Sequence, residues 1–506
     1  MRQGAFRVGL ATVIAIGLLG AIGAASGAGA ASTAVPLPSA DPFYAPPAHL
    51  ASYQPGTILR WRAVTISGVS DASAAYQLLY RTTDATGQAI AAVTTLALPS
   101  NPATGPRDLI SGFPAEDSLT TNCAPSYVLR TGQVSGVGDA GDSQSVQSFL
   151  QYGWDVAFPD YEGPDSEWTV GLLEGYAALD GIRAVEHFAL ADLEGARTQV
   201  AMAGYSGGAI PTLWGASLAK SYAPELNIVA AASGGNVPNP IEDLAPLNGS
   251  PLFGTVIGVA VGVNRAFPEL HLDSILNAKG QALAATDGSD GDGCGGLVTN
   301  APFGTVAEYS NYSTPEALLA LPNVRSVFAH EDLIGRAAPA APSLIVQSAQ
   351  DELAYTPPVA KLVAADCAQG ALIDYQTPPG EHVTGDEFFG EDALPYVQDR
   401  FAGKPAPDTC PPALPPHGTK LTQSLISKSK RRATFSFTAA GAITGFQCAL
   451  VQAKNGKHHK KAKVVFTRCS SPQMYKHLDK RPYGFEVRAV NFAGPDPHPA
   501  IKKFTI

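Results

Sequence analysis

The sequence has little charge for its length. Asp, Glu, Lys and Arg make up 15% of its 506 residues, whereas apolar residues make up 45%. A disordered chain would be more charged and less apolar, so this chain can bury a large core. None of its six cysteines forms a C-x-x-C pair, which argues against zinc and thioredoxin-like sites. We therefore expect a globular protein without a metal or another cofactor.

Long apolar runs are scarce, and the one that stands out lies at the N-terminus. Arg2 and Arg7 precede the apolar stretch 8–22, and small residues at 28–30 follow it. This order is typical of a cleaved signal peptide, which we place at residues 1–30, with a membrane anchor as the alternative. No second segment is long enough to span a bilayer. We expect a secreted, soluble protein whose cysteines form disulfides.

The charge is unevenly distributed along the chain. Residues 417–506 contain 17 Lys and Arg against 3 Asp and Glu, whereas the preceding residues contain 17 against 41. Between the two parts, residues 405–416 contain six prolines and are expected to form a stiff linker. The pattern predicts an acidic first domain, residues 41–410, and a basic second domain, residues 417–506, with different partners.

Short apolar runs alternate with helical patterns through the acidic part. Apolar residues recur at helical spacing from Leu172 to Val185 and again from Ala209 to Lys220. This alternation predicts an α/β fold with a mostly parallel sheet covered on both faces. Residues 233–330 lack strong strand patterns, and we expect a helical cap there rather than an irregular surface excursion. The expected strands are 58–66, 76–82, 89–98, 109–110, 154–158, 199–203, 228–231, 343–346 and 372–375.

The basic part has a pattern of closely spaced strands. Over roughly ninety residues this spacing predicts a small all-β sandwich. The order of the cysteines favours a disulfide between Cys448 and Cys469 within it. The expected strands are 433–438, 446–450, 463–467, 483–490 and 501–506.

The segment Gly204-Tyr205-Ser206-Gly207-Gly208 fits the pattern G-x-S-x-G. It follows an expected strand and begins an expected helix, as a nucleophile elbow does. Glycines on either side let the strand and the helix approach each other around a strained serine. The N-terminus of the helix also favours developing negative charge. We predict that Ser206 is a nucleophile, with an ordinary glycine-rich turn as the alternative.

A serine of this kind needs an acid and then a histidine downstream. Asp351 follows an expected strand, and His382 lies in a loop after the next one. His382 would take the proton of Ser206 and return it to the leaving alcohol. Asp351 would orient the imidazole and stabilise its positive form.

Other acids and histidines fit this order less well. Glu352, adjacent to Asp351, and Asp386, just after His382, remain alternative acids. The other histidines precede the serine, lie in or beside the expected cap, or lie in the linker and the second domain. They include His49, His187, His271, His330 and His417.

An acyl-transfer intermediate also needs two N–H donors for its oxyanion. The backbone amide of Gly207, directly after the serine, is the first expected donor. The second should come from an earlier strand-to-helix loop, and residues 112–118 lie in that place. Spacing does not identify the donor within this loop.

Six segments of the acidic part form a specific combination of motifs. They are Asp117-Ser118, Asn122-Cys123-Ala124-Pro125-Ser126-Tyr127, Asp160-Tyr161-Glu162-Gly163-Pro164, Leu179-Asp180-Gly181-Ile182-Arg183-Ala184, Gly204-Tyr205-Ser206-Gly207-Gly208 and Tyr222-Ala223-Pro224-Glu225-Leu226. Together they resemble the secretory lipase family, the group that contains the fungal A-type lipases, over about residues 41–410. The combination is far more specific than any single motif.

The resemblance implies an α/β-hydrolase core with a helical cap between the serine and the aspartate. It implies activity on acylglycerols and related esters, with a triad at Ser206, Asp351 and His382. It also implies a second oxyanion donor at Asp117. Because an ionised carboxylate cannot donate a hydrogen bond, this role needs the backbone N–H or a protonated side chain.

The resemblance further implies the disulfides Cys123–Cys294 and Cys367–Cys410. The chain departs from the family at Pro211, which removes a helical N–H and predicts a slight distortion of the elbow. The second domain is another departure, because the fungal enzymes lack it. It resembles an immunoglobulin-like module of bacterial exported proteins, through residues 446–448, 469–472 and 483–490.

These patterns predict a secreted lipase or esterase for triacylglycerol-type substrates that forms an acyl-enzyme. An acyltransferase or a serine peptidase could use the same triad. A non-catalytic surface-binding protein is a further alternative, although the complete set of Ser206, Asp351 and His382 argues against it. The basic run 457–463 favours binding of the second domain to an anionic cell-surface polymer or a lipid interface, unless it is a solvated loop without a partner. Export and the acidic catalytic body argue against nucleic acid.

Overall fold

The computed structural model describes residues 35–132, 141–287, 294, 296–410, 416–440, 443, 445–452, 464–491 and 494–506. The expected signal peptide, residues 288–293 and 295 of the expected cap, residues 411–415 of the expected linker, and the basic run 457–463 lie outside these residues. Within the described ranges, no helix is long and apolar enough to cross a membrane. The same ranges contain no group of three His, Cys, Asp or Glu side chains placed to hold a metal ion.

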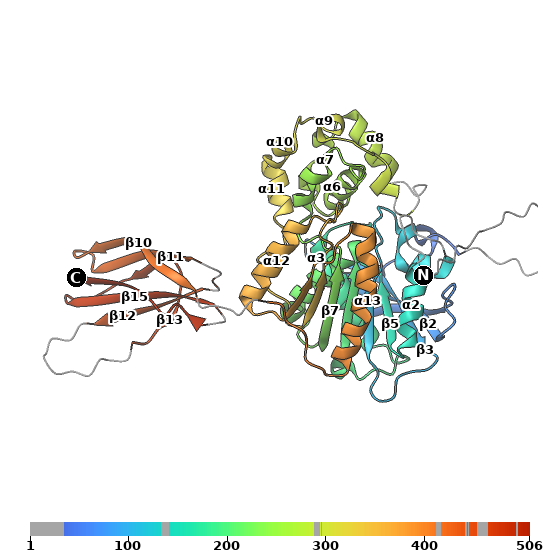
Figure 1. Ribbon diagram of the computed structural model, residues 1–506, viewed down its shortest axis with the longest axis horizontal. Coiled ribbons are helices and arrows are strands. Elements are labelled where there is room, and N and C mark those ends of the chain that lie inside the picture. Colours follow the sequence, from blue (N-terminus) through green and yellow to red (C-terminus); the bar gives the residue numbers. More distant parts are fainter. Residues whose placement is uncertain are drawn as a thin grey trace, which may run out of the picture. The chain divides into compact units, whose positions relative to one another are not determined.

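A nine-stranded mixed sheet organises the acidic part of the chain (Figure 1). Its order is β1-β2-β3-β5-β4-β6-β7-β8-β9. The first three strands are antiparallel, and the strands from β5 to β9 run parallel. Their bounds are β1 Ile58–Val64, β2 Ala72–Thr83, β3 Ala89–Pro99, β4 Leu109–Phe113, β5 Asp155–Pro159, β6 Val200–Tyr205, β7 Ile228–Gly234, β8 Ser343–Val346 and β9 Ile373–Gln376.

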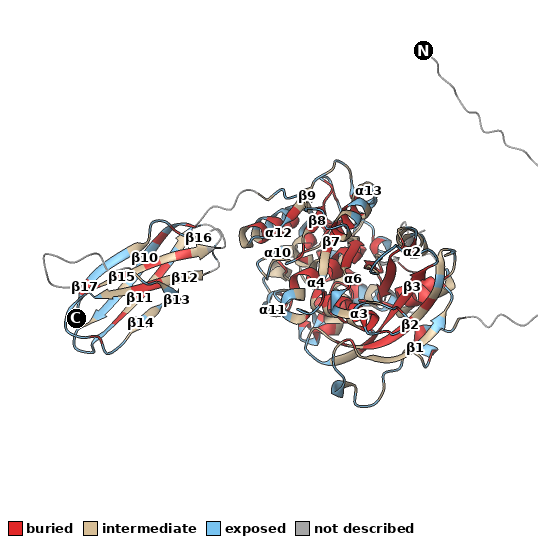
Figure 2. Ribbon diagram, turned by 90° about the horizontal axis from the view of Figure 1, so that it is seen from below, coloured by how far each residue is buried: buried red, intermediate tan, exposed pale blue. Residues whose placement is uncertain are grey.

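The central strands are buried on both faces, which explains their continuous apolar runs. Every residue of β4 and β5 is buried, and Figure 2 shows this buried centre in red. Neighbouring residues of a strand point to opposite faces. Ile110 packs in the core with helices α2 (Gly141–Gln151) and α13 (His382–Phe401), whereas Leu109 packs in the core with α3 (Gly171–Glu186).

A helical insertion, residues 235–342, separates β7 from β8. Its helices gather at one end of the sheet (Figure 1). They contribute Phe253, Ile257 and Val263 to an apolar core that also includes Leu173 of α3. The expected cap, 233–330, falls within this stretch apart from its first two residues, which end β7. The helices are η6 Pro240–Asp243, α5 Leu244–Leu247, α6 Gly254–Ala266, η7 Pro268–Leu270, α7 Leu272–Ile275, α8 Ala278–Asp287, η8 Gly296–Thr299, α9 Val306–Tyr309, α10 Pro315–Leu319 and α11 Pro322–Phe328.

The described residues from 416 onward form two β-sheets. One has the order β10-β11-β14; the other has β13-β12-β15-β16, with β17 also paired to β15. Their shared core contains Phe435 stacked on Phe485 at 4.1 Å between ring centroids. The strands are β10 His417–Ser427, β11 Arg432–Ala440, β12 Gly445–Gln452, β13 Thr467–Cys469, β14 Gln473–Tyr475, β15 Pro482–Asn491, β16 Gly494–Pro495 and β17 Ala500–Thr505. We call this part the C-terminal module.

Three strands of the C-terminal module, β10, β14 and β16, were not expected from the sequence, and one was misplaced. Strand β10 lies at a sheet edge and exposes most of its polar side chains, so its sequence lacks a clear apolar alternation. Strand β14 has only three residues. The expected strand 463–467 was placed too early, because β13 begins at Thr467 and pairs Cys469 with Phe446.

Three disulfides connect distant segments of the chain. Cys123–Cys294 joins the loop after β4 to the helical insertion. Cys367–Cys410 joins helix α12 (Thr356–Gln369) to the segment after α13. Cys448–Cys469 joins β12 to β13. Disulfides of this kind fit an oxidising compartment outside the cytoplasm.

Candidate active site

Ser206 lies in a sharp turn between β6 and helix α4 (Ala209–Tyr222). Its φ of 55° is in the left-handed region, which non-glycine residues rarely adopt. The neighbouring backbone segments are too close for side chains: a Cβ at Gly204 would lie 2.2 Å from the carbonyl oxygen of Gly208. Helix α4 continues across Pro211. Proline lacks a backbone N–H, and the N–H groups of a helix's first turn have no intrahelical acceptor, so no helical hydrogen bond is lost there. The strained turn presents the Ser206 side chain at the carboxyl end of the sheet.

His382 joins Ser206 to Asp351 through both ring nitrogens. Nε2 lies 2.8 Å from the Ser206 Oγ, and Nδ1 lies 2.9 Å from the Asp351 Oδ2. The side chains come from three separate segments: the turn after β6, the loop after β8, and the start of α13. Sequence reasoning placed His382 in a loop, but it is the first residue of helix α13.

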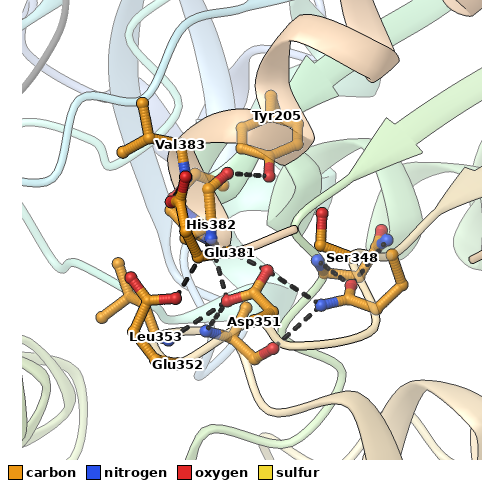
Figure 3. A network of polar contacts seen from close by, with 12 residues as sticks. Tyr205, Ser348, Asp351, Glu352, Leu353, Glu381, His382 and Val383 are labelled. Atoms are coloured by element: carbon orange, nitrogen blue, oxygen red, sulfur yellow. Dashed lines mark hydrogen bonds and ion pairs between the residues drawn. The ribbon is translucent and has the colours of Figure 1, made fainter. Parts of the chain in front are cut away.

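Asp351 is buried, and hydrogen bonds fix both of its carboxylate oxygens (Figure 3). The backbone amides of Leu353 and Ala354 donate to Oδ1 at 3.1 and 2.8 Å. The side-chain amide of Gln347 donates to Oδ2 at 3.0 Å. A carboxylate with this many donors keeps a fixed orientation toward the imidazole.

The backbone of His382 is held from both sides (Figure 3). The Tyr205 hydroxyl donates to its carbonyl oxygen at 2.5 Å, and its amide donates to Glu352 at 3.1 Å. The Glu381 side chain caps helix α13 by accepting from the amides of Val383 and Thr384. Burial would lower the pKa of His382, but its hydrogen bond and charge attraction to Asp351 outweigh this effect and raise the pKa.

The loop after β4 places Asp117 beside the elbow. Its φ is 41°, and its carboxyl group packs so closely on Gly207 that a Cβ there would lie 2.2 Å from Oδ1. The Trp168 indole N–H donates to this same Oδ1 at 3.1 Å. Burial raises the pKa of Asp117, and the nearby His382 and the Trp168 hydrogen bond offset only part of this rise.

An apolar cavity extends from the elbow into the helical insertion. Its empty volume is about 1120 Å³. Ser206, Gly207 and Asp117 are its polar lining at the sheet. Aliphatic and aromatic side chains line most of the remainder, including Ile257 and Ala260 of α6, Ile275 of α7, Leu318 of α10 and Phe328 of α11. The other polar side chains in the lining are Thr169, Asp243, Thr255 and Ser310. A cavity of this composition suits an apolar ligand with one reactive polar end.

Comparison with known proteins identifies the family to which this site belongs. Residues 130–409 match the secretory lipase family, which is more than half of the chain. The chain belongs to the secretory lipase family. Membership makes the protein a carboxylic ester hydrolase, so the resemblance expected from the motifs is confirmed for residues 130–409.

Three similar proteins place this enzyme within the family. A secreted triacylglycerol lipase of Malassezia furfur is 31% identical over 382 residues, 73% of this chain and 77% of the relative. A probable inactive lipase of Mycobacterium tuberculosis is 34% identical over 383 residues, 74% of this chain and 84% of the relative. The X-ray structure of Candida antarctica lipase A is 32% identical with a TM-score of 0.69, covering 74% of this chain and 89% of that one. An α/β-hydrolase fold is therefore shown for the acidic part of the enzyme.

The alternative acids and histidines lie elsewhere or contact other groups. Glu352 accepts the backbone amide of His382 rather than its ring. His187 contacts the Arg183 carbonyl oxygen, and His330 stacks on Phe267. Among the described histidines, His382 is the one within hydrogen-bond distance of Ser206.

Sequence reasoning missed three residues that hold the site of the enzyme in place. Gln347 directly follows an expected strand, and Tyr205 lies inside the G-x-S-x-G motif, so position could have suggested both. Trp168 lies outside every motif used above, four residues after the segment that ends at Pro164, and only folding brings it to Asp117. Its role could not have been read from spacing.

Buried carboxyl groups surround the Asp117 loop. Burial raises the pKa of Glu116, Glu162 and Glu174 well above the usual range, and repulsion by neighbouring carboxyl groups raises it further. The Tyr161 hydroxyl donates to the Pro114 carbonyl oxygen at 2.7 Å and accepts the Glu116 amide at 2.9 Å, which fixes the loop. The surroundings of Asp117 therefore favour neutral carboxyl groups.

Proposed function

We propose that the enzyme hydrolyses long-chain acyl esters of the triacylglycerol type through an acyl-enzyme on Ser206. The continuous hydrogen-bonded chain from Ser206 through His382 to Asp351, at the end of an apolar cavity, carries this proposal. The relative from Malassezia furfur, named as a triacylglycerol lipase, supports the same substrate class.

The reaction starts when His382 Nε2 accepts the Ser206 proton while Oγ attacks the ester carbonyl carbon. The carbonyl electron pair moves to oxygen and forms a tetrahedral oxyanion. Collapse of this intermediate breaks the bond to the alcohol, which leaves with the proton from His382. Water then attacks the acyl-enzyme by the same route and releases the fatty acid and free Ser206. Asp351 stabilises the imidazolium in both steps.

The oxyanion would be bound by the backbone N–H of Gly207 and by the protonated carboxyl group of Asp117. Oδ1 of Asp117 accepts the Trp168 N–H. The proton of the neutral acid would therefore be on Oδ2, from which it can be donated to the oxyanion. The raised pKa of Asp117 and its neutral neighbours support this protonation state. Two donors of this kind are what an acyl-transfer site requires.

The apolar cavity would hold the acyl chain, with the helical insertion acting as a cap over the site. Its lining is almost entirely apolar, so it favours an extended hydrocarbon over a peptide side chain with a polar backbone. This observation favours ester hydrolysis over the peptidase alternative. Acyl transfer to another alcohol would use the same residues. The two reactions differ in whether water or an alcohol attacks the acyl-enzyme.

The remaining expectations extend this proposal to the whole chain. Residues 1–30 would direct secretion and be cleaved, and residues 41–410 would form the catalytic domain with a cap at about 233–330. Residues 405–416 would be a linker, and 417–506 an immunoglobulin-like sandwich, supported by its two packed sheets and the Cys448–Cys469 disulfide.

Hydrolysis of 4-nitrophenyl esters of increasing chain length by the mature protein tests the proposal. Ser206→Ala should reduce turnover by a factor on the order of a million, whereas Ser221→Ala, an exposed serine at the end of α4, should leave it unchanged. Activity retained by Ser206→Ala would exclude the acyl-enzyme. A mature protein that is inactive on every ester would contradict the proposal and favour the non-catalytic alternative.

Ala260→Phe tests the place of the acyl chain. The added ring would fill part of the cavity beside α6, so cleavage of long-chain esters should fall while that of acetate esters persists. Equal effects on short and long esters would place the acyl chain elsewhere.

A further inference from the structure

The C-terminal module concentrates positive charge in two adjacent segments. Residues 428–432 comprise the turn between β10 and β11 and the first residue of β11, and residues 476–481 connect β14 to β15. Their basic side chains are all exposed: Lys428, Lys430, Arg431, Arg432, Lys476, Lys480 and Arg481. The only acid in the two segments is Asp479. We call these two segments the basic end.

Hydrogen bonds hold the two segments of the basic end together. The Leu478 amide donates to the Arg431 carbonyl oxygen at 3.0 Å, and the Arg431 Nε donates to the Leu478 carbonyl oxygen at 2.6 Å. Asp479 lies 3.1 Å from both Arg431 and Arg481. The one acid is thus paired within the cluster, and the surrounding positive charge is left without another carboxylate in either segment.

Apolar side chains are exposed next to this charge. On the three-stranded sheet, Thr434 is paired directly with Leu425 on one side and with Met474 on the other. Directly paired residues share a face of a sheet, so the three side chains form a row across it. Leu425 is 57% exposed and Met474 is 45% exposed. Thr434 lies two residues from Arg432, so the row borders the basic end.

The rest of the module offers little negative charge to compete with this surface. Residues 417–506 contain three acids. Asp479 is paired as described, and Asp496 is buried and accepts from the amide and hydroxyl of Thr419. Glu486 is the third, on β15 in the other sheet. A surface approaching the basic end therefore meets seven cations and one paired carboxylate.

We propose that the basic end and the Leu425–Thr434–Met474 row dock the module on an anionic lipid surface. Cations near such a surface attract its phosphate headgroups, and apolar side chains beside them can enter the interfacial region. A soluble polyanion would use the cations but gain nothing from exposed Leu425 and Met474, so their position favours lipid. The docking concerns the module's own surface and does not depend on the proposed reaction at Ser206.

Sedimentation of the mature full-length protein with vesicles tests the docking. Vesicles of mixed phosphatidylcholine and phosphatidylglycerol should bind the protein, and pure phosphatidylcholine vesicles should bind it far less. Lys428→Gln with Lys430→Gln should weaken binding by on the order of ten- to thirtyfold, from roughly fivefold per lysine. Added salt should weaken binding of the original protein more than that of the variant.

The matched control removes the same charge at a distance from the basic end. Lys420 pairs with Thr438, six residues along β11 from Arg432, and Arg468 lies on β13 in the other sheet. Lys420→Gln with Arg468→Gln should change vesicle binding by less than threefold. Equal weakening by both pairs would mean that only net charge matters and would overturn the proposed surface.

A third variant separates lipid from polymer. Leu425→Ser with Met474→Ser should weaken vesicle binding several-fold and leave binding to soluble polyphosphate unchanged. If it leaves vesicle binding unchanged, or if polyphosphate binds as tightly as the vesicles, the lipid assignment is wrong. Circular dichroism of each variant establishes that the module is folded, and turnover of a soluble ester establishes that the enzyme is folded.

Discussion

The acidic part of the chain and the C-terminal module bury their carboxyl groups in opposite ways. In the acidic part, burial raises the pKa of Asp160 to about 7 and that of Glu331 to about 8. In the module, burial would also raise the pKa of Asp496, but hydrogen bonds from Thr419 and the His498 amide lower it below its usual range. Asp160 and Glu331 therefore remain largely neutral at pH values at which Asp496 is already charged.

Burial and donated hydrogen bonds act in opposite directions on each carboxyl group, and their balance explains the difference. At Asp160, burial outweighs two hydrogen bonds from Ser126. Glu331 accepts one backbone amide, from Gly171 at 2.6 Å. Asp496 accepts the amide and hydroxyl of Thr419 and the amide of His498. Hydrogen bonds to the charged form stabilise it, whereas burial without them favours the neutral form.

The largest expected effect tests whether the two regions are separate folding units. Phe435→Ala removes a fully buried ring of the module and should destabilise the module by about 3–5 kcal/mol. Calorimetry should show this loss in one transition, while turnover of a soluble short-chain ester is unchanged. Phe158→Ala, which removes a buried ring from β5, should instead destabilise the acidic part, lower esterase activity and leave the module's transition unchanged. Loss of esterase activity in Phe435→Ala would contradict the division into domains.

The pH dependence of stability should differ in sign between the two regions. Raised pKa values, as at Asp160 and Glu331, stabilise the fold at low pH, and this stabilisation is lost as pH rises from about 4 to 8. The acidic part should therefore lose up to a few kcal/mol over this range. The lowered pKa of Asp496 acts oppositely, so the module should lose stability as pH falls below about 4. Thermal unfolding between about pH 3 and about pH 9 measures both slopes.

Glu331→Gln sharpens this prediction at one position. Glutamine resembles the neutral acid and keeps an acceptor for the Gly171 amide, but it does not titrate. The variant should lose part of the slope between about pH 5 and pH 8, with the module's transition unaffected. An unchanged slope would mean that Glu331 does not bind its proton more tightly in the folded state.

The smallest expected effect concerns the single donor to Asp117. Trp168→Phe removes the N–H that fixes Oδ1, so kcat should fall about tenfold, or about 1.4 kcal/mol, with little change in KM. That hydrogen bond lowers the pKa of Asp117 against the larger effect of burial. Its loss should raise this pKa. Because the proposed oxyanion donor is protonated Asp117, activity should then persist to higher pH before Asp117 ionises.

Two further variants separate this effect from a general loss of packing. Trp61→Phe, at a half-exposed tryptophan of β1, should leave both rate and pH profile unchanged. Asp117→Asn provides a neutral donor at every pH and should remove the alkaline limit attributed to Asp117. A Trp168→Phe enzyme that is slower but has an unshifted pH profile would contradict the positioning role.

Most of the sheet could be predicted from the sequence. Buried parallel strands such as β4 and β5 require continuous short apolar runs, and alternation with helical spacing follows from covering both faces. Strand β10 could not be predicted, because an edge strand facing solvent needs no apolar alternation. Hydrogen bonds between distant residues could not be predicted from sequence patterns either. The hydrogen bond from Trp168 to Asp117 joins residues that are 51 positions apart in the chain.

The sequence by itself determined the elbow at Ser206, the order of Ser206, Asp351 and His382, and the division into an acidic and a basic part. These features depend on local backbone sterics, chain order and composition, which are properties of neighbouring residues. Only the tertiary structure decided which carboxyl groups are neutral, how Trp168 orients Asp117, and where the basic end meets an apolar row. Each of these depends on burial and on distances between segments far apart in the chain, because the free energy of a charge is set by what surrounds it in space.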